Sequence, residues 1–269
     1  MNNATYVEHF HDRVKLTVVE HVAEVVLVRS RQHNGLDWEM IDGLLAAQRR
    51  LAELDGLRAV VLAGEGESFC AGLDMAAIMT QPQRLPTLLM ADAADGINPV
   101  QRMALGWRDA GVPVIAALQG HVYGGGLQIA LGADIRIAHP EASLALLEID
   151  WGIIPDMAIS VTGAGLRQDV LQELALTGRR VPGAEACQLG LVTRISEAPL
   201  ELAREIARDI ASRSPRAVAA ARELFAKALT LELRERLALE ARLQQGLLGS
   251  AEQREAATAR VERRLPHFD

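Results

Sequence analysis

Cysteine is scarce in this chain of 269 residues, which contains only Cys70 and Cys187. Two cysteines do not make the disulfide framework of a small secreted protein, and a chain of this length can bury a sizeable core without one. The segment from Met1 to Thr5 also lacks the basic and then apolar pattern of a signal peptide. We therefore expect a cytoplasmic protein whose cysteines stay reduced.

Basic charge and aromatic residues are also in short supply. The chain has 28 Lys and Arg against 35 Asp and Glu, a formal net charge of −7, and only 3% aromatic residues. Nucleic-acid binding normally needs a basic face, and stacking on bases needs aromatic rings. No apolar run approaches the roughly 20 residues that span a bilayer. These shortages argue against a nucleic-acid partner and against a membrane partner.

Several motifs of catalysis and cofactor binding are missing as well. The chain has no G-x-G-x-x-G sequence, no glycine turn that continues into Gly-Lys-Ser/Thr, and no G-x-S-x-G. Its seven histidines show no H-x-x-x-H or similar ligand spacing. We therefore expect no metal, no bound nucleotide cofactor and no hydrolase of the serine-elbow type.

What the chain does contain is a pair of glycine-bearing turns about fifty residues apart, at 69–74 and 120–126. Each turn follows an apolar run typical of a strand, at 59–63 and 114–118, and each opens a predicted helix. The first N–H groups of a helix have no intrahelical partner, and the helix dipole favours negative charge there. Two such turns aimed at one point would hold an oxyanion, such as an enolate. The alternative is tight packing of each helix against a sheet.

The rest of the first 198 residues alternates between predicted strands and helices, which is typical of an α/β fold. Asp37 is expected to cap a helix that runs to about residue 54. Further strands are predicted at 14–18, 22–28 and 134–138, with short pieces around 143–146 and 178–181, a helix near 99–110, and an irregular, mobile segment at 80–98.

The composition changes at about residue 199, where glycine nearly vanishes and Ala, Leu, Glu and Arg dominate. Helices are predicted at 199–212, 215–246 and 250–263. The middle helix carries an apolar stripe that must be covered by its own core or by another subunit. We therefore divide the chain into a core at 1–198 and a helical oligomerisation region at 199–269.

Two acidic residues are candidates for chemistry. Glu148 lies in an apolar stretch, where burial would raise its pKa and let it accept and return a proton near neutral pH. The alternative is a strand-end Glu that faces solvent. Asp156 follows eight residues later and could instead cap a helix after Pro155. We expect the thiol of Cys70 to be buried and inert rather than nucleophilic.

Several stretches together form an ordered pattern from about residue 15 to residue 230. They are 34–37 (NGLD), 58–64, 68–74 (SFCAGLD), 113–117, 120–126 (GHVYGGG), 133–138, 148–155, and 176–180 followed by 184–186 and 189–192. In this order they resemble the crotonase family, also named the enoyl-CoA hydratase/isomerase superfamily. The resemblance implies a crotonase-like spiral of ββα units with C-terminal helices that build a homotrimer or a dimer of trimers.

The resemblance also implies that the substrate is an acyl-CoA thioester, with coenzyme A as a part of the substrate and no separate cofactor. It assigns the backbone N–H groups of Leu73 and Gly125 to an oxyanion hole that holds the thioester oxygen. The residues of the first turn would lie along coenzyme A. These residues are Cys70, Ala71, Gly72, Leu73 and Asp74.

The hydratases of this family carry one Glu three residues after the middle glycine and a second Glu twenty residues later. Here these positions are Gln128 and Glu148. An amide cannot exchange a proton at neutral pH, so Gln128 is left to position substrate or a water molecule. A single base can still move a proton along the acyl chain, as in the family's Δ3,Δ2-enoyl-CoA isomerases. Glu148 and Asp156 also match the two ends of the proton shuttle in its dienoyl-CoA isomerases, which carry a third acid at the position of Gln128.

We therefore expect an enzyme of fatty acid metabolism that shifts double bonds, with Glu148 as the main acid and base and Asp156 as a second proton carrier. One alternative is an enoyl-CoA hydratase that is slow or that uses Asp156 to activate water. Another is a non-catalytic acyl-CoA-binding protein, which would have no need for a buried carboxylate.

Overall fold

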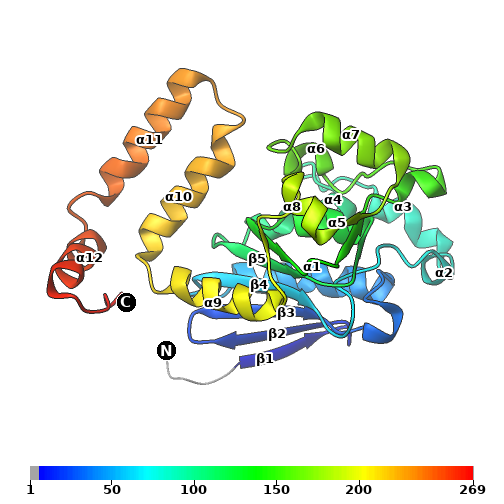
Figure 1. Cartoon of the computed structure of the whole chain (residues 1–269), viewed down its shortest axis with the longest axis horizontal. Helices are drawn as coiled ribbons and strands as arrows, with labels where there is room; N and C mark the ends of the chain where they lie inside the picture. Colours follow the sequence, from blue (N-terminus) through cyan, green and yellow to red (C-terminus); the bar gives the residue numbers. More distant parts are fainter. Residues whose placement is uncertain (1–5, 269) are drawn as a thin grey trace.

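The computed structural model describes residues 6–268 and has a mixed α/β fold (Figure 1). Residues 1–5, where a signal-peptide pattern is lacking, and residue 269 lie outside the described residues. The main sheet has seven strands in the order β1-β2-β3-β4-β5-β7-β10. Its strands are β1 (Tyr6–Phe10), β2 (Val14–Val19), β3 (Val22–Leu27), β4 (Ala59–Gly64), β5 (Val114–Leu118), β7 (Ile135–Ala138) and β10 (Arg194–Ile195).

The two halves of this sheet differ because their sequences differ. The first three strands pair antiparallel, and β2 and β3 alternate buried and less buried residues over most of their length. Strands β3, β4, β5, β7 and β10 pair in parallel. Every residue of β4 and β5 is buried, as expected for parallel strands that are covered on both faces. The apolar runs at 59–63 and 114–118 therefore became the centre of the sheet.

A second, three-stranded sheet carries the second glycine turn. It contains β6 (His121–Tyr123), β8 (Ser143–Ala145) and β9 (Val181–Pro182) in the order β6-β8-β9. Because β6 ends at the turn and lies parallel to β8, the chain leaves both strands on the same side. The two segments that follow them are thus brought together.

The helices within residues 38–188 cover the sheets. Asp37 caps α1 by accepting a hydrogen bond from the Met40 N–H, which confirms the predicted start of that helix. The helices of residues 38–188 are α1 (Trp38–Ala52), α2 (Met75–Ile78), α3 (Leu85–Leu88), α4 (Pro99–Leu105), α5 (Gly125–Leu131), α6 (Ile159–Thr162), α7 (Gln168–Thr177) and α8 (Gly183–Gln188). Single 3-10 turns occur at Ser30–Gln32, Pro82–Arg84, Gly106–Arg108 and Glu148–Trp151.

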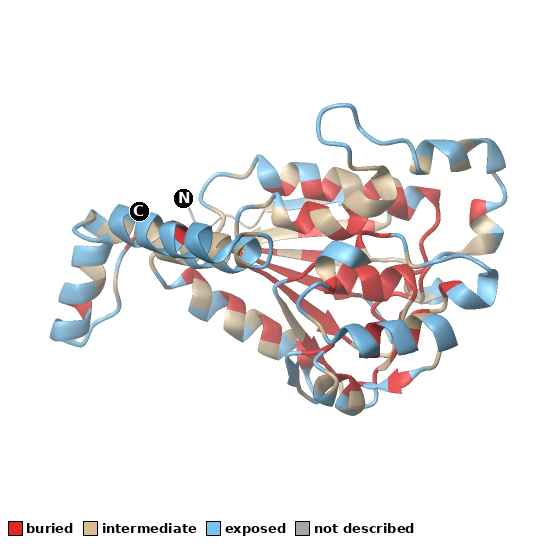
Figure 2. Ribbon diagram, turned by 90° about the horizontal axis from the view of Figure 1, so that it is seen from above, coloured by how far each residue is buried: buried red, intermediate tan, exposed pale blue. Residues whose placement is uncertain are grey.

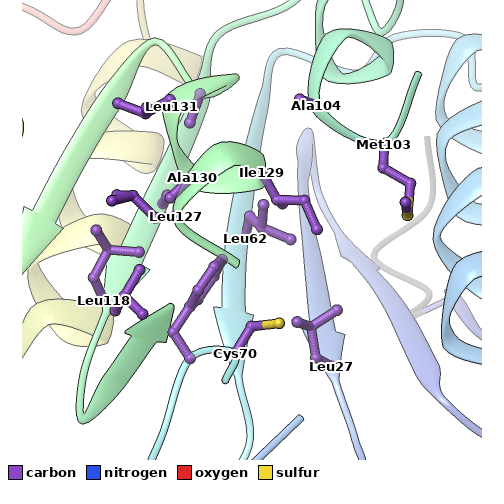
Figure 3. Close-up of a cluster of buried hydrophobic side chains, with 14 of the residues drawn as sticks. Leu27, Leu62, Cys70, Met103, Ala104, Leu118, Leu127, Ile129, Ala130 and Leu131 are labelled. Atoms are coloured by element: carbon purple, nitrogen blue, oxygen red, sulfur yellow. The ribbon is translucent and has the colours of Figure 1, made fainter. Parts of the chain in front are cut away.

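Short helix α5 is buried along its whole length. Figure 3 shows Leu127 and Ile129 of this helix together with Leu62 of β4 and Cys70 of the first turn, all within one cluster of buried apolar side chains. Burying a Leu or Ile side chain contributes about 1.5–3 kcal/mol, so this cluster fixes the helix firmly on the sheet. The N-terminus of α5 is therefore a rigid place for a functional group.

The last part of the chain forms four helices, α9 (Pro199–Ala211), α10 (Pro215–Ala228), α11 (Leu233–Leu247) and α12 (Ala251–Glu262). The prediction of one helix over 215–246 is wrong, because the chain turns before Glu232. The backbone of Glu232 is extended, and its side chain and that of Glu235 form a reciprocal capping box that starts α11. Figure 1 shows α10 and α11 side by side, and Arg222 of α10 pairs with Asp134 at 3.0 Å.

Helix α9 differs from the three helices that follow it. Ala203 and Ala207 of α9 are fully buried against β4, β5 and β7, whereas few residues of α10–α12 are buried (Figure 2). Large apolar side chains are left exposed there, among them Phe225, Leu229, Leu233 and Leu237. The predicted domain division at 198/199 stays a prediction, and residues on both sides of it share one core.

None of the helices within residues 6–268 combines the length and the hydropathy that crossing a bilayer requires.

Candidate active site

A short ladder of backbone hydrogen bonds holds the two glycine turns side by side. The Cys70 N–H donates to the His121 carbonyl at 3.0 Å, and the Tyr123 N–H donates to the Cys70 carbonyl at 3.0 Å. Gly72 has a φ of +85°, and a Cβ there would lie 2.7 Å from the Tyr123 carbonyl oxygen and 3.6 Å from the Gly125 nitrogen. Only glycine allows this close approach. The turns singled out in the sequence thus meet at one point.

The N–H groups of Leu73 and Gly125 donate to no other group within residues 6–268. Gly125 is the first residue of α5, where an N–H has no intrahelical partner. Leu73 lies between two bonds to Leu36, whose N–H donates to the Gly72 carbonyl and whose carbonyl accepts from the Asp74 N–H. Both predicted oxyanion-hole donors are therefore available, and their role stays a prediction.

Arg29 supports the first turn from behind. Its guanidinium pairs with Asp37 at 2.9 Å and with Asp74 at 2.9 Å, and it donates to the Gly35 carbonyl at 3.0 Å. Asp74 also accepts from the Ala77 N–H. Burial would raise the pKa of Asp74, but these two contacts outweigh it and hold the pKa of that carboxyl below its usual value. The carboxylate of Asp74 is thus engaged by the protein, and its contact with coenzyme A stays a prediction.

Asn34 is a structural residue of the site for which the sequence analysis gave no role. It is fully buried with a φ of +55°, and its amide nitrogen donates to the carbonyls of Glu65 and Ser68 at 3.0 and 2.8 Å. Its side-chain oxygen accepts from the Arg29 N–H. Asparagine tolerates a left-handed backbone better than most residues. An Asn before Gly35 was therefore the sequence signal that could have indicated a tight turn at this position.

The remaining residues of the first turn offer a ligand little side chain. Cys70 is fully buried, and burial raises the pKa of its thiol to about 12, which confirms the expectation of an inert thiol. Ala71 donates its N–H to the His33 carbonyl at 2.9 Å. Contact between coenzyme A and the segment from Cys70 to Asp74 stays a prediction.

Glu148 opens the 3-10 turn that follows β8 and is only 9% exposed. Its Oε1 accepts a hydrogen bond from Nε2 of Gln128 at 2.6 Å, and its buried Oε2 has no partner within the described chain. Burial raises the pKa of Glu148, the charge of Asp156 raises it further, and the bond from Gln128 opposes the rise. The predicted pKa rise is confirmed, and the alternative of a solvent-facing Glu is wrong.

Glu148 lies directly against the second glycine turn. A Cβ on Gly124, whose φ is +49°, would lie 3.2 Å from Oε1 of Glu148. Gly124 immediately precedes Gly125 in the chain. The carboxylate of Glu148 therefore lies against the residue next to the one whose N–H is available. The predicted proton carrier and one predicted oxyanion donor thus lie together, and their roles stay predictions.

Asp156 is exposed in the loop between the 3-10 turn and α6. The alternative of a helix cap is wrong, because Ala158 is the N-cap of α6 and no side chain caps that helix. Desolvation nevertheless raises the pKa of Asp156. The charge of Asp156 also raises the pKa of Glu148, which places the two predicted acids within electrostatic reach of one another.

Gln128 is 1% exposed on α5, and both ends of its amide are engaged by the protein. Nε2 donates to Glu148, and Oε1 accepts from the Met157 N–H at 2.9 Å. The structure therefore brings Gln128, Glu148 and the segment after Asp156 together. Contact between Gln128 and substrate or water stays a prediction.

Across residues 6–268, no group of three or more His, Cys, Asp and Glu side chains is placed to share a metal ion.

Comparisons with known proteins agree with this geometry. The family model of enoyl-CoA hydratase/isomerase matches residues 17–269. The (E)-benzylidenesuccinyl-CoA hydratase of Thauera aromatica is 34% identical over 262 residues, which cover 95% of this chain and 98% of that protein. The carnitinyl-CoA dehydratase of Proteus mirabilis is 32% identical over 231 residues, or 82% of each chain. The crystal structure of an enoyl-CoA hydratase from Polaromonas sp. JS666 superposes with a TM-score of 0.84 at 25% identity, covering 95% of this chain and 99% of that one.

Proposed function

The chain belongs to the enoyl-CoA hydratase/isomerase family, and from that premise we propose that it shifts a double bond along enoyl- or dienoyl-CoA thioesters. One observation carries this preference over hydration. The amide of Gln128 stands where the family's hydratases place a second acid, and its two ends are bound to Glu148 and Met157. Glu148 is a buried carboxylate that lies against the second glycine turn, and one base suffices for a double-bond shift.

The proposed reaction uses Glu148 twice. Its carboxylate takes a proton from carbon 2 of a 3-enoyl thioester, and the electrons of that C–H bond move toward the thioester oxygen. The N–H groups of Leu73 and Gly125 hold the resulting negative charge. Glu148 then returns the proton to carbon 4, and the double bond ends between carbons 2 and 3. No atom is gained or lost, so neither water nor a redox cofactor is consumed.

Asp156 extends this scheme to conjugated substrates. A dienoyl thioester must exchange protons at two carbons that lie farther apart than one carboxylate reaches. Asp156 has a raised pKa and is electrostatically coupled to Glu148. In the proposal it serves the distant carbon while Glu148 serves the carbon next to the thioester.

Hydration is the second candidate function. The Thauera and Proteus relatives are named a hydratase and a dehydratase, which favours it. In this chain Asp156 would have to activate the water, because Gln128 cannot accept a proton. Asp156 is exposed and has a raised pKa, as such a base would need.

A direct product assay tests the proposal. Purified protein is offered 2-enoyl-, 3-enoyl- and 3,5-dienoyl-CoA, and hydrated and isomerised products are separated by chromatography. Isomerised product without 3-hydroxyacyl-CoA supports the double-bond shift, and Glu148→Gln serves as the inactive control. Rapid formation of 3-hydroxyacyl-CoA would replace the proposal by hydration. Binding of acyl-CoA without deuterium uptake from solvent would replace it by a non-catalytic binding role.

Self-association through the C-terminal helices is part of the proposal. The exposed apolar side chains of α10 and α11, including Phe225 and Leu233, are large for a surface that remains in water. We expect a trimer or a dimer of trimers in light scattering. A monomer at micromolar concentration would contradict it.

A further inference from the structure

The buried amide of Gln128 can be oriented in only one way. The Met157 backbone N–H is always a donor, so the atom of Gln128 that faces it at 2.9 Å must be the oxygen. The amide nitrogen therefore faces Glu148, at 2.6 Å from Oε1. Because Gln128 is 1% exposed, water is not available to replace either bond.

This orientation makes the two oxygens of Glu148 unequal. Oε1 faces an N–H donor and must accept from it whether or not the carboxyl is protonated. Oε2 is buried and has no partner within residues 6–268. A proton on Oε1 would point at the amide N–H and lose that bond, so the proton belongs on Oε2.

The other end of the amide positions the segment that contains Asp156. Met157 is buried, and its sulfur lies against Gly125, where a Cβ would be 2.9 Å from Sδ. Asp156 immediately precedes Met157, and Ala158 follows with a φ of +57°. One amide thus connects Glu148 to the loop of Asp156 and, through Met157, to the second glycine turn.

We propose that Gln128 is a positioning residue that makes Oε2 the proton-carrying oxygen of Glu148 and holds the Asp156–Met157 segment against Gly125. This inference rests on the proposed function in that Glu148 carries the proton. The inference goes beyond the proposed function because it states which of the two oxygens of Glu148 carries the proton and which hydrogen bonds decide that. An acid at position 128 would lack this fixed polarity, because a carboxylate cannot donate to Glu148 and accept from Met157 unless it is protonated.

Two variants and one control test the proposal. Gln128→Leu removes both bonds, while Gln128→Glu keeps the shape and can restore both bonds only while the acids at 128 and 148 share a proton. Gln48→Leu is the matched control. Gln48 is also a buried glutamine, 4% exposed, but its side chain bonds to the Met103 carbonyl and to neither Glu148 nor Asp156. All three are compared with the wild type as full-length protein.

The first measurement needs no substrate. The pKa of Glu148 is followed by NMR with glutamate labelled at its carboxyl carbon, and Glu148→Gln assigns the signal. In Gln128→Leu we expect a higher pKa of Glu148, since one of the donors that stabilise its charge is gone, and no change in the Gln48→Leu control. An unchanged titration in Gln128→Leu would overturn the proposal, even if the wild type proves to be a hydratase.

The second measurement is the pH profile of kcat. We expect Gln128→Leu to lose about 100-fold in kcat with little change in KM, because the base and the loop shift by a fraction of an ångström. Gln128→Glu should recover activity while the pair at 128 and 148 shares one proton and lose it again at higher pH, which adds a falling limb absent from the wild type. Equal, pH-independent activity of both variants would overturn the proposal. If Gln128→Leu does not fold, the falling limb of Gln128→Glu decides alone.

Discussion

The two halves of the candidate site are built from different materials. The proposed oxyanion half consists of backbone N–H groups at Leu73 and Gly125, held by strand pairing and by Gly72, whose positive φ and close approach to the Tyr123 carbonyl leave no room for a side chain. The proposed proton-transfer half consists of the side chains of Gln128, Glu148 and Asp156, among which the amide of Gln128 bonds to Glu148 and to the Met157 N–H. The first half depends on how the backbone is packed, and the second depends on which side chains can donate, accept or carry a proton.

This difference separates two ways in which the site can fail. A change beside the backbone half that presses against the main chain, as at Gly126, should disturb the fold as well as the reaction, because the atoms that it meets belong to the core. A change to the side-chain half should alter the reaction and leave the fold intact. The family premise fits this division, since an enolate needs the same two donors whichever carbon receives the proton.

The largest effect is expected for Glu148→Gln, which removes the proton carrier and keeps the shape. General acid–base catalysis contributes about 10²- to 10⁴-fold, so kcat should fall by about 10³-fold or more while acyl-CoA binding is retained. Steady-state kinetics and calorimetric titration with a non-reacting acyl-CoA measure the two effects. Near-normal turnover would remove Glu148 from the mechanism.

Gly125→Ala should have the next largest effect. The added Cβ would lie 2.9 Å from the side-chain ends of Leu36 and Met157, which can move, so the protein should fold with a displaced donor and lose about 100-fold in kcat. Gly126→Ala is the matched control, because its Cβ would lie 2.4 Å from the Cys70 carbonyl oxygen. We expect the control to lower the melting temperature more than Gly125→Ala does. The opposite ranking would show that the backbone half does not depend on packing as argued.

Asp156→Asn should have a smaller and substrate-dependent effect. Loss of this carboxylate should slow the dienoyl substrate about 10-fold and hardly change the 3-enoyl substrate, for which Glu148 suffices. The exposed Asp150, on the same 3-10 turn as Glu148, gives the control Asp150→Asn. Equal losses on both substrates would mean that Asp156 acts only through the local charge.

The smallest effect concerns stability. The folded protein raises the pKa of Glu148 above its unfolded value, so the folded state binds the proton more tightly than the unfolded state. Stability contributed by this group is therefore lost as pH rises from the unfolded pKa through the folded pKa. Glu148→Gln should melt at a higher temperature than the wild type above that window and at a similar temperature below it. A lower melting temperature at neutral pH would contradict the burial argument.

The sequence predicted well that the two glycine turns meet at one point. The short apolar runs at 59–63 and 114–118, bounded by glycine or proline, favour buried strands, and chains that leave parallel neighbours depart from the same edge of the sheet. The cap at Asp37 was likewise visible, because capping is a local bond within one turn. Local patterns of this kind need no knowledge of the rest of the chain.

The contacts that orient the side-chain half could not be predicted. The hydrogen bond from the Met157 N–H to Gln128 joins residues that are 29 apart along the chain, and no local sequence pattern around either residue predicts it. The ion pair of Arg29 with Asp74 and the amide bonds of Asn34 also cross between loops. The break before Glu232 was missed because Leu229–Leu231 contains neither glycine nor proline, and the capping box becomes evident only when the chain has turned.

Gln128 has a consequence for how such an enzyme can change in evolution. Glutamine and glutamate codons differ at a single base, so one point mutation would exchange the amide for a second acid without altering the size of the side chain. The two backbone donors and the core beneath them would be inherited unchanged. A change between moving a double bond and adding water across it would then need very few mutations in this gene, whereas a change of the acyl-CoA-binding scaffold would need many.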